Sequence, residues 1–230
     1  MTSSLTKRIR SIQDSLPESV KLIAVSKKVS VAAMREAYAA GIRDFGESKV
    51  QEATSKIEQL QDLSGITWHF IGHLQSNKAK KALSYFQWFH SVDSLKLAQR
   101  LNLLASEMGI SPKVCLQVKI LPDPSKSGFT VSQLLDDLVE LNLCQSLQFE
   151  GLMTIPPLGL ETPEVMKVFN QTRELATKID RRNLENIKIK QLSMGMSQDY
   201  QLAIQSGATM IRLGTILFGE RQLESEKDEV

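Results

Sequence analysis

The sequence predicts an α/β fold, and within that class a single (β/α)8 TIM-like barrel with an extra N-terminal helix. Short apolar runs alternate with longer segments of helical periodicity along the chain, which is typical of parallel strands joined by crossover helices. Eight such runs occur in 230 residues, and that length suits one closed barrel. No G-x-G-x-x-G follows the first run, so an open doubly wound sheet is the weaker alternative.

The elements follow in order from residue 5. Leu5, Ile9, Ile12 and Leu16 share one helix face, and Pro17 ends this leading helix. Strands are predicted at 21–26, 42–47, 67–72, 88–92, 113–119, 147–153, 189–194 and 209–214. Helical segments between them include 31–41, 95–109, 131–143, 165–179 and 199–207. Their boundary residues include Ser30 as an N-cap, with Gly41, Gly109 and Gly207 just past helix ends.

Composition and charge argue against several classes of function. The chain is 42% hydrophobic and 23% charged, which is typical of an ordinary globular protein. Net charge is only +2, and the basic residues are scattered apart from small clusters at 78–81 and 181–182, so nucleic acid is not an expected partner. The segment from Ser76, SNKAKKA, is interpreted as a capped helix with a basic face.

The chain also lacks the signals of membrane insertion and disulfide bonding. No apolar run approaches a membrane span, so no membrane association and a cytoplasmic location are expected. Cys115 and Cys144 lie in apolar surroundings and are predicted to be buried free thiols. One domain is predicted over 1–221, followed by an acidic, disordered tail over 222–230.

Two lysines, Lys27 and Lys28, end the first predicted strand. Barrels carry their working residues at the C-terminal ends of strands, and an amine in an apolar barrel mouth can form an imine with an aldehyde. Alternation along a strand sends the two side chains to opposite faces. Because this strand is apolar on both faces, the pattern does not decide which lysine faces the lumen, and a solvated strand end is the simpler alternative.

Two segments near the far end of the chain suit a phosphate group. They are SMGMS, 193–197, and RLGT, 212–215. Glycine allows close backbone approach, hydroxyl and amide groups donate hydrogen bonds, and Ser197 is predicted to cap a following helix. Ordinary helix caps and turns use the same residues, so these segments alone leave both interpretations open.

A metal site is not expected. His69 and His73 are four residues apart, as in helical zinc sites, but they lie in a predicted strand, where that spacing separates them by roughly 13 Å.

Several motifs together resemble one family. They are AVSK (24–27), DFGESKVQEA (44–53), WHFIGHLQSNKAK (68–80), HSVDS (90–94), SKSGF (125–129), GLMTIP (151–156) and the long segment 192–221. Through about residue 221 the chain resembles the pyridoxal phosphate homeostasis protein family, which is related to the barrel domain of bacterial alanine racemase. The resemblance implies the barrel of the pyridoxal phosphate enzymes of fold type III.

The resemblance also implies a set of site residues. Lys27 is implied to carry pyridoxal 5′-phosphate as a covalent imine, the internal aldimine, and Arg212 to face the pyridine nitrogen. The phosphate is implied to be held by Ser193, Gly195, Ser197, Gly214 and Thr215. Where the family commonly reads FGENYVQE this chain reads FGESKVQE, so Ser48 takes the place of an asparagine in the expected cofactor site. Opposite a guanidinium, the pyridine nitrogen is not readily protonated, so the cofactor is a weak electron sink.

The function implied by the resemblance is non-catalytic binding of pyridoxal phosphate in vitamin B6 homeostasis and amino-acid balance. No catalytic residues are predicted, a monomer is expected, and pyridoxal-phosphate-dependent apo-enzymes are candidate partners. One alternative is an alanine-type racemase of low activity, which needs a second base. In racemases that base is a tyrosine from an additional domain, whereas Tyr38, Tyr85 and Tyr200 are predicted in or beside helices. A Schiff-base aldolase without a cofactor is the other alternative.

Overall fold

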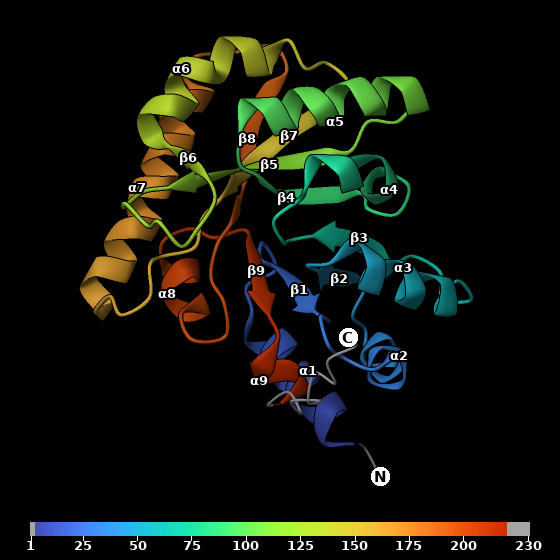
Figure 1. The fold of residues 1–230 in the computed structure, drawn as a ribbon. Coiled ribbons are helices and arrows are strands. Elements are labelled where there is room, and N and C mark those ends of the chain that lie inside the picture. The colour runs from blue at the N-terminus through green and yellow to red at the C-terminus, as the bar shows by residue number, and fades with distance from the viewer. Residues whose placement is uncertain (1–2, 220–230) are drawn as a thin grey trace, which may run out of the picture.

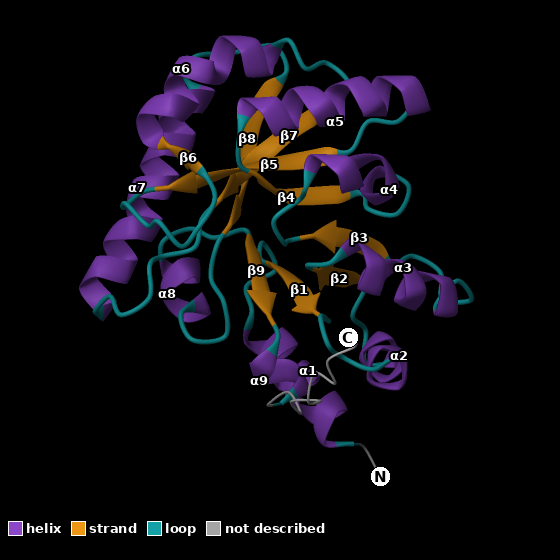
Figure 2. Cartoon of the chain, viewed as in Figure 1, coloured by secondary structure: helices purple, strands orange, loops and turns teal. Residues whose placement is uncertain are grey.

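The computed structural model describes residues 3–219, and the predicted tail at 222–230 lies outside this part. Eight parallel strands close into a barrel in the order β4-β3-β2-β1-β9-β8-β7-β5, with β5 paired to β4 (Figure 2). These strands are β1 Lys21–Val25, β2 Asp44–Glu47, β3 Thr67–Phe70, β4 Trp88–Val92, β5 Lys113–Lys119, β7 Gln148–Met153, β8 Ile187–Ser193 and β9 Met210–Leu213. The predicted (β/α)8 barrel is confirmed. The two-residue strand β6, Phe129–Thr130, lies beside β5 and was not predicted.

Helices surround the barrel on its outer side (Figure 1). They are α1 Ser4–Ser15, α2 Val31–Ala39, α3 Val50–Gln59, α4 Ala79–Leu83, α5 Leu95–Met108, α6 Val131–Asn142, α7 Thr162–Asp180, α8 Tyr200–Gln205 and α9 Thr215–Phe218, with the 3-10 turn η1 Ser76–Lys78 before α4. The extra N-terminal helix is confirmed as α1. It lies beside α9, where Arg8 Nε donates a hydrogen bond to Leu217 O at 2.7 Å.

Local chemistry explains most helix boundaries. Ser30 Oγ accepts a hydrogen bond from Ala33 N at 3.3 Å and so caps α2. Gly109 ends α5 in the left-handed region at φ 64°. The prediction that Ser76 caps a helix is wrong, because Gln75 occupies the N-cap position of η1 and makes no side-chain cap bond.

The strands carry two hydrophobic layers. The larger layer lies between strands and helices, and Ala24 of β1 belongs to it. The smaller layer fills the barrel interior with Ile23, Trp88, Cys115, Met153 and Met210. Strand alternation therefore points Ile23 into the lumen and Ala24 toward the helices. Lys27 follows Ile23 by four residues and lies two residues past Val25, the last residue of β1, where the barrel opens.

Two further predictions concern the whole chain. Cys115 and Cys144 are both buried free thiols, as predicted. Among the helices of residues 3–219, none has the length and apolar character needed to cross a membrane.

Candidate functional site

A cavity of about 670 Å³ opens at the C-terminal ends of the barrel strands. Its size is typical of a small-ligand site. The apolar part of its wall includes Val25, Ile71, Ile155, Met196 and Leu202, and its polar part includes Lys27, Ser197, Asp199, Arg212 and Thr215. Residues from the two ends of the chain therefore meet in one site, because β1 and β9 are neighbours in the barrel.

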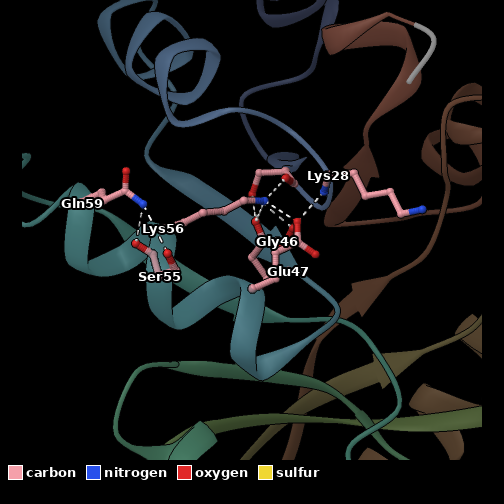
Figure 3. A network of polar contacts seen from close by, with 8 residues as sticks. Lys28, Gly46, Glu47, Ser55, Lys56 and Gln59 are labelled. Atoms are coloured by element: carbon pink, nitrogen blue, oxygen red, sulfur yellow. Dashed lines mark hydrogen bonds and ion pairs between the residues drawn. The ribbon is translucent and has the colours of Figure 1, made fainter. Parts of the chain in front are cut away.

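The structure shows which of the two lysines faces the cavity, which the sequence alone could not decide. Lys27 is partly buried and lines the cavity, whereas Lys28 is exposed. Lys28 also has a left-handed backbone conformation, at φ 59°, and Figure 3 shows its side chain pointing away from the neighbouring polar network. Lys27 and Lys28 thus form the turn that follows the end of β1 at Val25.

A buried polar network holds the backbone on both sides of Lys27 (Figure 3). Lys56, from α3, donates from Nζ to Ser26 O at 2.6 Å, to Glu47 Oε1 at 3.0 Å and to Glu52 Oε1 at 2.6 Å. Ser26 Oγ donates to Glu47 Oε1 at 2.7 Å, and the Lys28 backbone N–H donates to Glu52. We call Ser26, Glu47, Glu52 and Lys56 the Lys56 cluster.

Burial governs the electrostatics of the Lys56 cluster. Glu47 is fully buried, and this burial raises its pKa above the usual value, while Lys56 and Ser26 act in the opposite direction. Burial also works against ionisation of Glu52, but hydrogen bonds from Lys56 and from the Lys28 backbone bring its pKa below the usual value. The cluster therefore places an ion pair in a poorly solvated position next to Lys27.

Sequence reasoning did not single out Glu47 or Lys56. A lysine in a helix is usually a solvated residue, so Lys56 gave no reason to expect burial. The i, i+4 spacing of Glu52 and Lys56 was the one available signal.

The loop after β8 and the start of α9 form the polar end of the cavity. Ser197 Oγ accepts hydrogen bonds from Gly214 N and Ile216 N, each at 3.4 Å. The prediction that Ser197 caps the following helix is wrong, because Asp199 is the N-cap residue of α8. The Asp199 carboxylate instead accepts from Met196 N at 2.6 Å within the loop. Two backbone N–H groups and a hydroxyl thus converge at the cavity wall, an arrangement suited to an anion.

Gly195 gives this loop its shape. It has φ 95°, and a Cβ at this position would lie 2.6 Å from Ala203 Cβ. Only glycine fits both the conformation and the close approach to α8. Gly195 does not itself line the cavity among the residues that the structure describes.

Two further predicted site residues, Ser193 and Ser48, lie away from the cavity wall. Ser193 is fully buried, and its Oγ lies 2.7 Å from both His90 Nδ1 and Arg212 Nη1. Ser48 follows β2, where its carbonyl oxygen is so close to Gly72 that a Cβ there would lie 2.2 Å away. Direct contact of Ser48, Ser193 or Gly195 with a cofactor stays a prediction.

Arg212 presents a cation to the cavity from β9. Its side chain is held by neutral acceptors, with Nη1 donating to Ser193 Oγ at 2.7 Å and Nη2 to Thr154 O at 3.1 Å. The residue is 4% exposed, and burial lowers its pKa to about 10, so it stays charged at neutral pH. None of the ion pairs within residues 3–219 includes Arg212.

The two histidines with zinc-like spacing have separate surroundings. His69 is buried in the barrel, and its Nε2 lies 2.9 Å from Asp44 Oδ1. His73 is exposed, and its Nδ1 lies 2.9 Å from Asp93 Oδ2. The described part of the chain contains no group of three or more side chains that could hold a metal ion.

The donor set of the cavity fits the cofactor that the resemblance implies. An amine from β1, a guanidinium from β9 and the N–H groups at Gly214 and Ile216 all meet a partly apolar wall. Such a site suits a small aromatic group that carries an anion at one end and an electrophilic carbonyl that can react with the amine.

Comparisons with known proteins identify the family. A family model described as "Alanine racemase, N-terminal domain" matches residues 2–222. The pyridoxal phosphate homeostasis protein of Synechocystis sp. is 50% identical over 206 residues, which cover 90% of this chain and 94% of that protein. The Escherichia coli protein of the same name is 38% identical over 207 residues, covering 89% of this chain and 87% of its own length.

Solved structures agree. PipY of Synechococcus elongatus, determined with PLP bound, has a TM-score of 0.90 and 50% identity, and the match covers 94% of this chain and all of that one. An alanine racemase of Clostridium difficile has a TM-score of 0.77 at 20% identity, covering 96% of this chain and 57% of that chain, which is a likeness of fold. The chain therefore belongs to the pyridoxal phosphate homeostasis proteins, within the alanine racemase N-terminal domain family.

Proposed function

We propose that this protein holds pyridoxal 5′-phosphate, attached covalently through its aldehyde to Lys27, as a non-catalytic carrier in cytoplasmic vitamin B6 homeostasis and amino-acid balance. The observation that carries the proposal is the meeting of Lys27, Arg212 and the Ser197–Gly214 loops in one cavity. The names of the relatives and the PLP-bound structure of PipY support the same conclusion.

Each polar part of the cavity has a distinct task in this proposal. Ser197, Thr215 and the backbone N–H groups of Gly214 and Ile216 hold the phosphate. Arg212 faces the pyridine nitrogen as a donor, and its charge disfavours protonation of that nitrogen. When bound, pyridoxal phosphate supplies an aldehyde and an electron-withdrawing ring, and a ring left unprotonated withdraws electrons less strongly.

The cavity offers little for proton transfer. Of its described lining residues, only Lys27, Asp199 and Arg212 carry titratable side chains. Tyr38, Tyr85 and Tyr200, all within the described range, do not line it. A racemase needs bases on both faces of its substrate, so this wall favours holding the cofactor over racemisation.

Absorbance spectroscopy tests the covalent attachment. The purified protein is expected to be yellow, and borohydride is expected to fix the cofactor to Lys27. Lys27→Ala should abolish the band and leave the fold intact, because a cavity lysine contributes little packing. The adjacent Lys28→Ala is the matched control and should keep the colour. A protein that takes up no added pyridoxal phosphate would overturn the proposal, and loss of colour only in Lys28→Ala would move the attachment by one residue.

Two further assays separate the carrier from the alternatives. Incubation with L- and D-alanine in deuterated water should give little or no deuterium incorporation, whereas turnover like that of a dedicated enzyme would establish a racemase. Delivery to partners is tested by adding a cofactor-free acceptor enzyme and following both spectra. Transfer predicts loss of the carrier band and gain of acceptor activity. Sedimentation of the purified chain tests the expected monomer.

A further inference from the structure

A continuous line of hydrogen-bonding side chains crosses the barrel interior from Asp44 to Arg212. Asp44 Oδ1 lies 2.9 Å from His69 Nε2, and His69 Nδ1 lies 2.9 Å from His90 Nε2. His90 Nδ1 lies 2.7 Å from Ser193 Oγ, which accepts from Arg212 Nη1 at 2.7 Å. The five residues come from β2, β3, β4, β8 and β9. His69, His90 and Ser193 are fully buried, so water does not interrupt the line.

The two ends determine the direction of every hydrogen bond in this line. Arg212 can only donate, and an ionised Asp44 can only accept, so His69 carries its proton on Nε2. Burial lowers the pKa of His69 and that of His90, which keeps both rings neutral. Neutral His69 then accepts at Nδ1 from His90 Nε2–H, and His90 Nδ1 accepts from the Ser193 hydroxyl. All four donors therefore point from Arg212 toward Asp44.

We propose that Asp44, at the N-terminal end of β2 and away from the cavity, orients this line and thereby positions the Arg212 guanidinium at the cavity. Bonds that point the same way polarise one another, so the anion at one end supports the cation at the other. The line supplies Arg212 with an acceptor whose lone pairs are kept available, because the Ser193 proton is committed to His90.

The surroundings favour this task over a purely structural one. Lys21 Nζ contacts Asp44 Oδ1 at 3.1 Å but is 46% exposed, so it neutralises the carboxylate only weakly. Trp88 stacks on His69 with ring centroids 5.8 Å apart and covers the ring with an apolar face. Apolar side chains of similar volume are often at least as stabilising as buried polar groups, so stability alone is a weak reason for this line.

The functional consequence rests on the proposed binding of pyridoxal phosphate. Arg212 is the residue expected to face the pyridine nitrogen, so its position and charge affect both affinity and the absorption of the bound cofactor. If Asp44 loses its charge, an amide at that position can donate to His69 and allow the opposite tautomers. Ser193 would then receive hydrogen bonds from both His90 and Arg212, and the hydrogen bond that positions Arg212 would weaken.

Nitrogen-15 NMR of the histidine rings tests the direction without any cofactor. The chain has only three histidines, and His73 is exposed, so His73→Gln assigns the two buried rings. Wild-type apo-protein is expected to show both His69 and His90 protonated at Nε2 alone. A proton on Nδ1 of either buried ring in the wild type would overturn the proposal. The one variant that the assignment uses, His73→Gln, changes an exposed side chain.

Asp44→Asn tests the influence on the cavity, and Asp93→Asn is its matched control. Both carboxylates pair with a histidine at 2.9 Å, but the partner of Asp93, His73, is exposed and this pair is not part of the line. Asp44→Asn should populate Nδ1-protonated His90, weaken pyridoxal phosphate binding by roughly fivefold or more and shift the absorption maximum of the bound cofactor. Asp93→Asn should leave tautomers, affinity and spectrum unchanged.

The outcomes separate this inference from the proposed function. Unchanged tautomers, affinity and spectrum in Asp44→Asn would refute the influence of Asp44 while leaving the carrier function intact. If neither the wild-type protein nor Asp44→Asn binds pyridoxal phosphate, the carrier function is refuted. The ring tautomers of the two apo-proteins would still decide the inference about Asp44.

Discussion

Replacing Lys56 by methionine should destabilise the fold more than any change to a surface ion pair. Methionine keeps the length of the side chain and removes its charge and its three hydrogen bonds. Glu47 would then remain fully buried with only Ser26 as a hydrogen-bond partner, and its Oε2 has no partner within the described structure to begin with. The same change removes one of two hydrogen bonds to the backbone carbonyl of Ser26, directly before Lys27, and leaves the bond from Val29 N at 2.9 Å.

The size of the effect follows from this burial. Removing one member of a buried ion pair costs about 3–5 kcal/mol, because the other charge is left unpaired in a poorly solvated position. For a chain of this size such a loss lowers the melting temperature by about 10 °C. The loss of free energy of unfolding is limited, because Glu47 can take up a proton and become neutral.

That proton uptake gives the effect a pH dependence of known sign. In the folded protein burial raises the pKa of Glu47 above its ordinary value of 4.5. The folded state therefore binds more protons than the unfolded state between the two pKa values, and stability falls as pH rises through this window. Lys56 lowers the pKa of Glu47, so its removal moves that pKa further above 4.5 and widens the pH range in which stability falls. The extra destabilisation of Lys56→Met should accordingly be smaller at about pH 5 than at about pH 8.

Urea unfolding followed by circular dichroism measures these free energies at both pH values. Arg35→Met is the matched control, because Arg35 binds Asp62 through two bonds of 2.6 and 2.7 Å with both side chains exposed, and it should lose far less stability than Lys56→Met. The double variant Lys56→Met, Glu47→Gln should recover most of the loss, since no charge stays buried. A loss below about 1 kcal/mol for Lys56→Met at both pH values would refute this reasoning.

Three smaller predictions concern single residues. Lys28→Gly should raise the free energy of unfolding by about 1 kcal/mol, since glycine adopts φ 59° without strain; a loss measured by urea unfolding would contradict this. Cys115 should resist alkylation in native protein at neutral pH, because burial raises its pKa to about 12, and mass spectrometry should find it modified once urea unfolds the chain. Ser197→Ala should weaken pyridoxal phosphate binding about tenfold in equilibrium dialysis, whereas Ser84→Ala, far along the chain on an exposed helix end, should not.

Much of the fold could be predicted because each strand is a short apolar run separated from the next by a helical pattern. The eight predicted strands all exist, with ends that differ by up to two residues. Helices α3 and α9 were missed for physical reasons. Lys49, the N-cap residue of α3, makes no side-chain cap bond and so gives no start signal, and α9 is only four residues long.

The candidate site was predictable only where one strand or loop defines it. Alternation in β1 could not choose between Lys27 and Lys28 from the sequence, because both faces of the strand are apolar. The choice follows from packing, with Ile23 in the barrel interior and Ala24 against the helices. The hydrogen bond between His90 and Ser193 joins residues 103 positions apart. No local spacing in the sequence predicts such a contact.

Two buried polar systems support the cavity from different sides. The Lys56 cluster holds the backbone on both sides of Lys27, and the line from Asp44 holds Arg212. Apolar side chains of similar volume are often no less stabilising than such buried charges and polar groups, so stability alone is a weak account of either system. What they share is the outcome: an amine and a guanidinium from neighbouring strands, β1 and β9, are fixed at one cavity wall. The proposed carrier function, in which a reactive aldehyde is held without turnover, needs this fixed geometry more than it needs a mobile base. Removal of either support should therefore change the spectrum of the bound cofactor, and removal of Lys56 should lower the stability of the barrel as well.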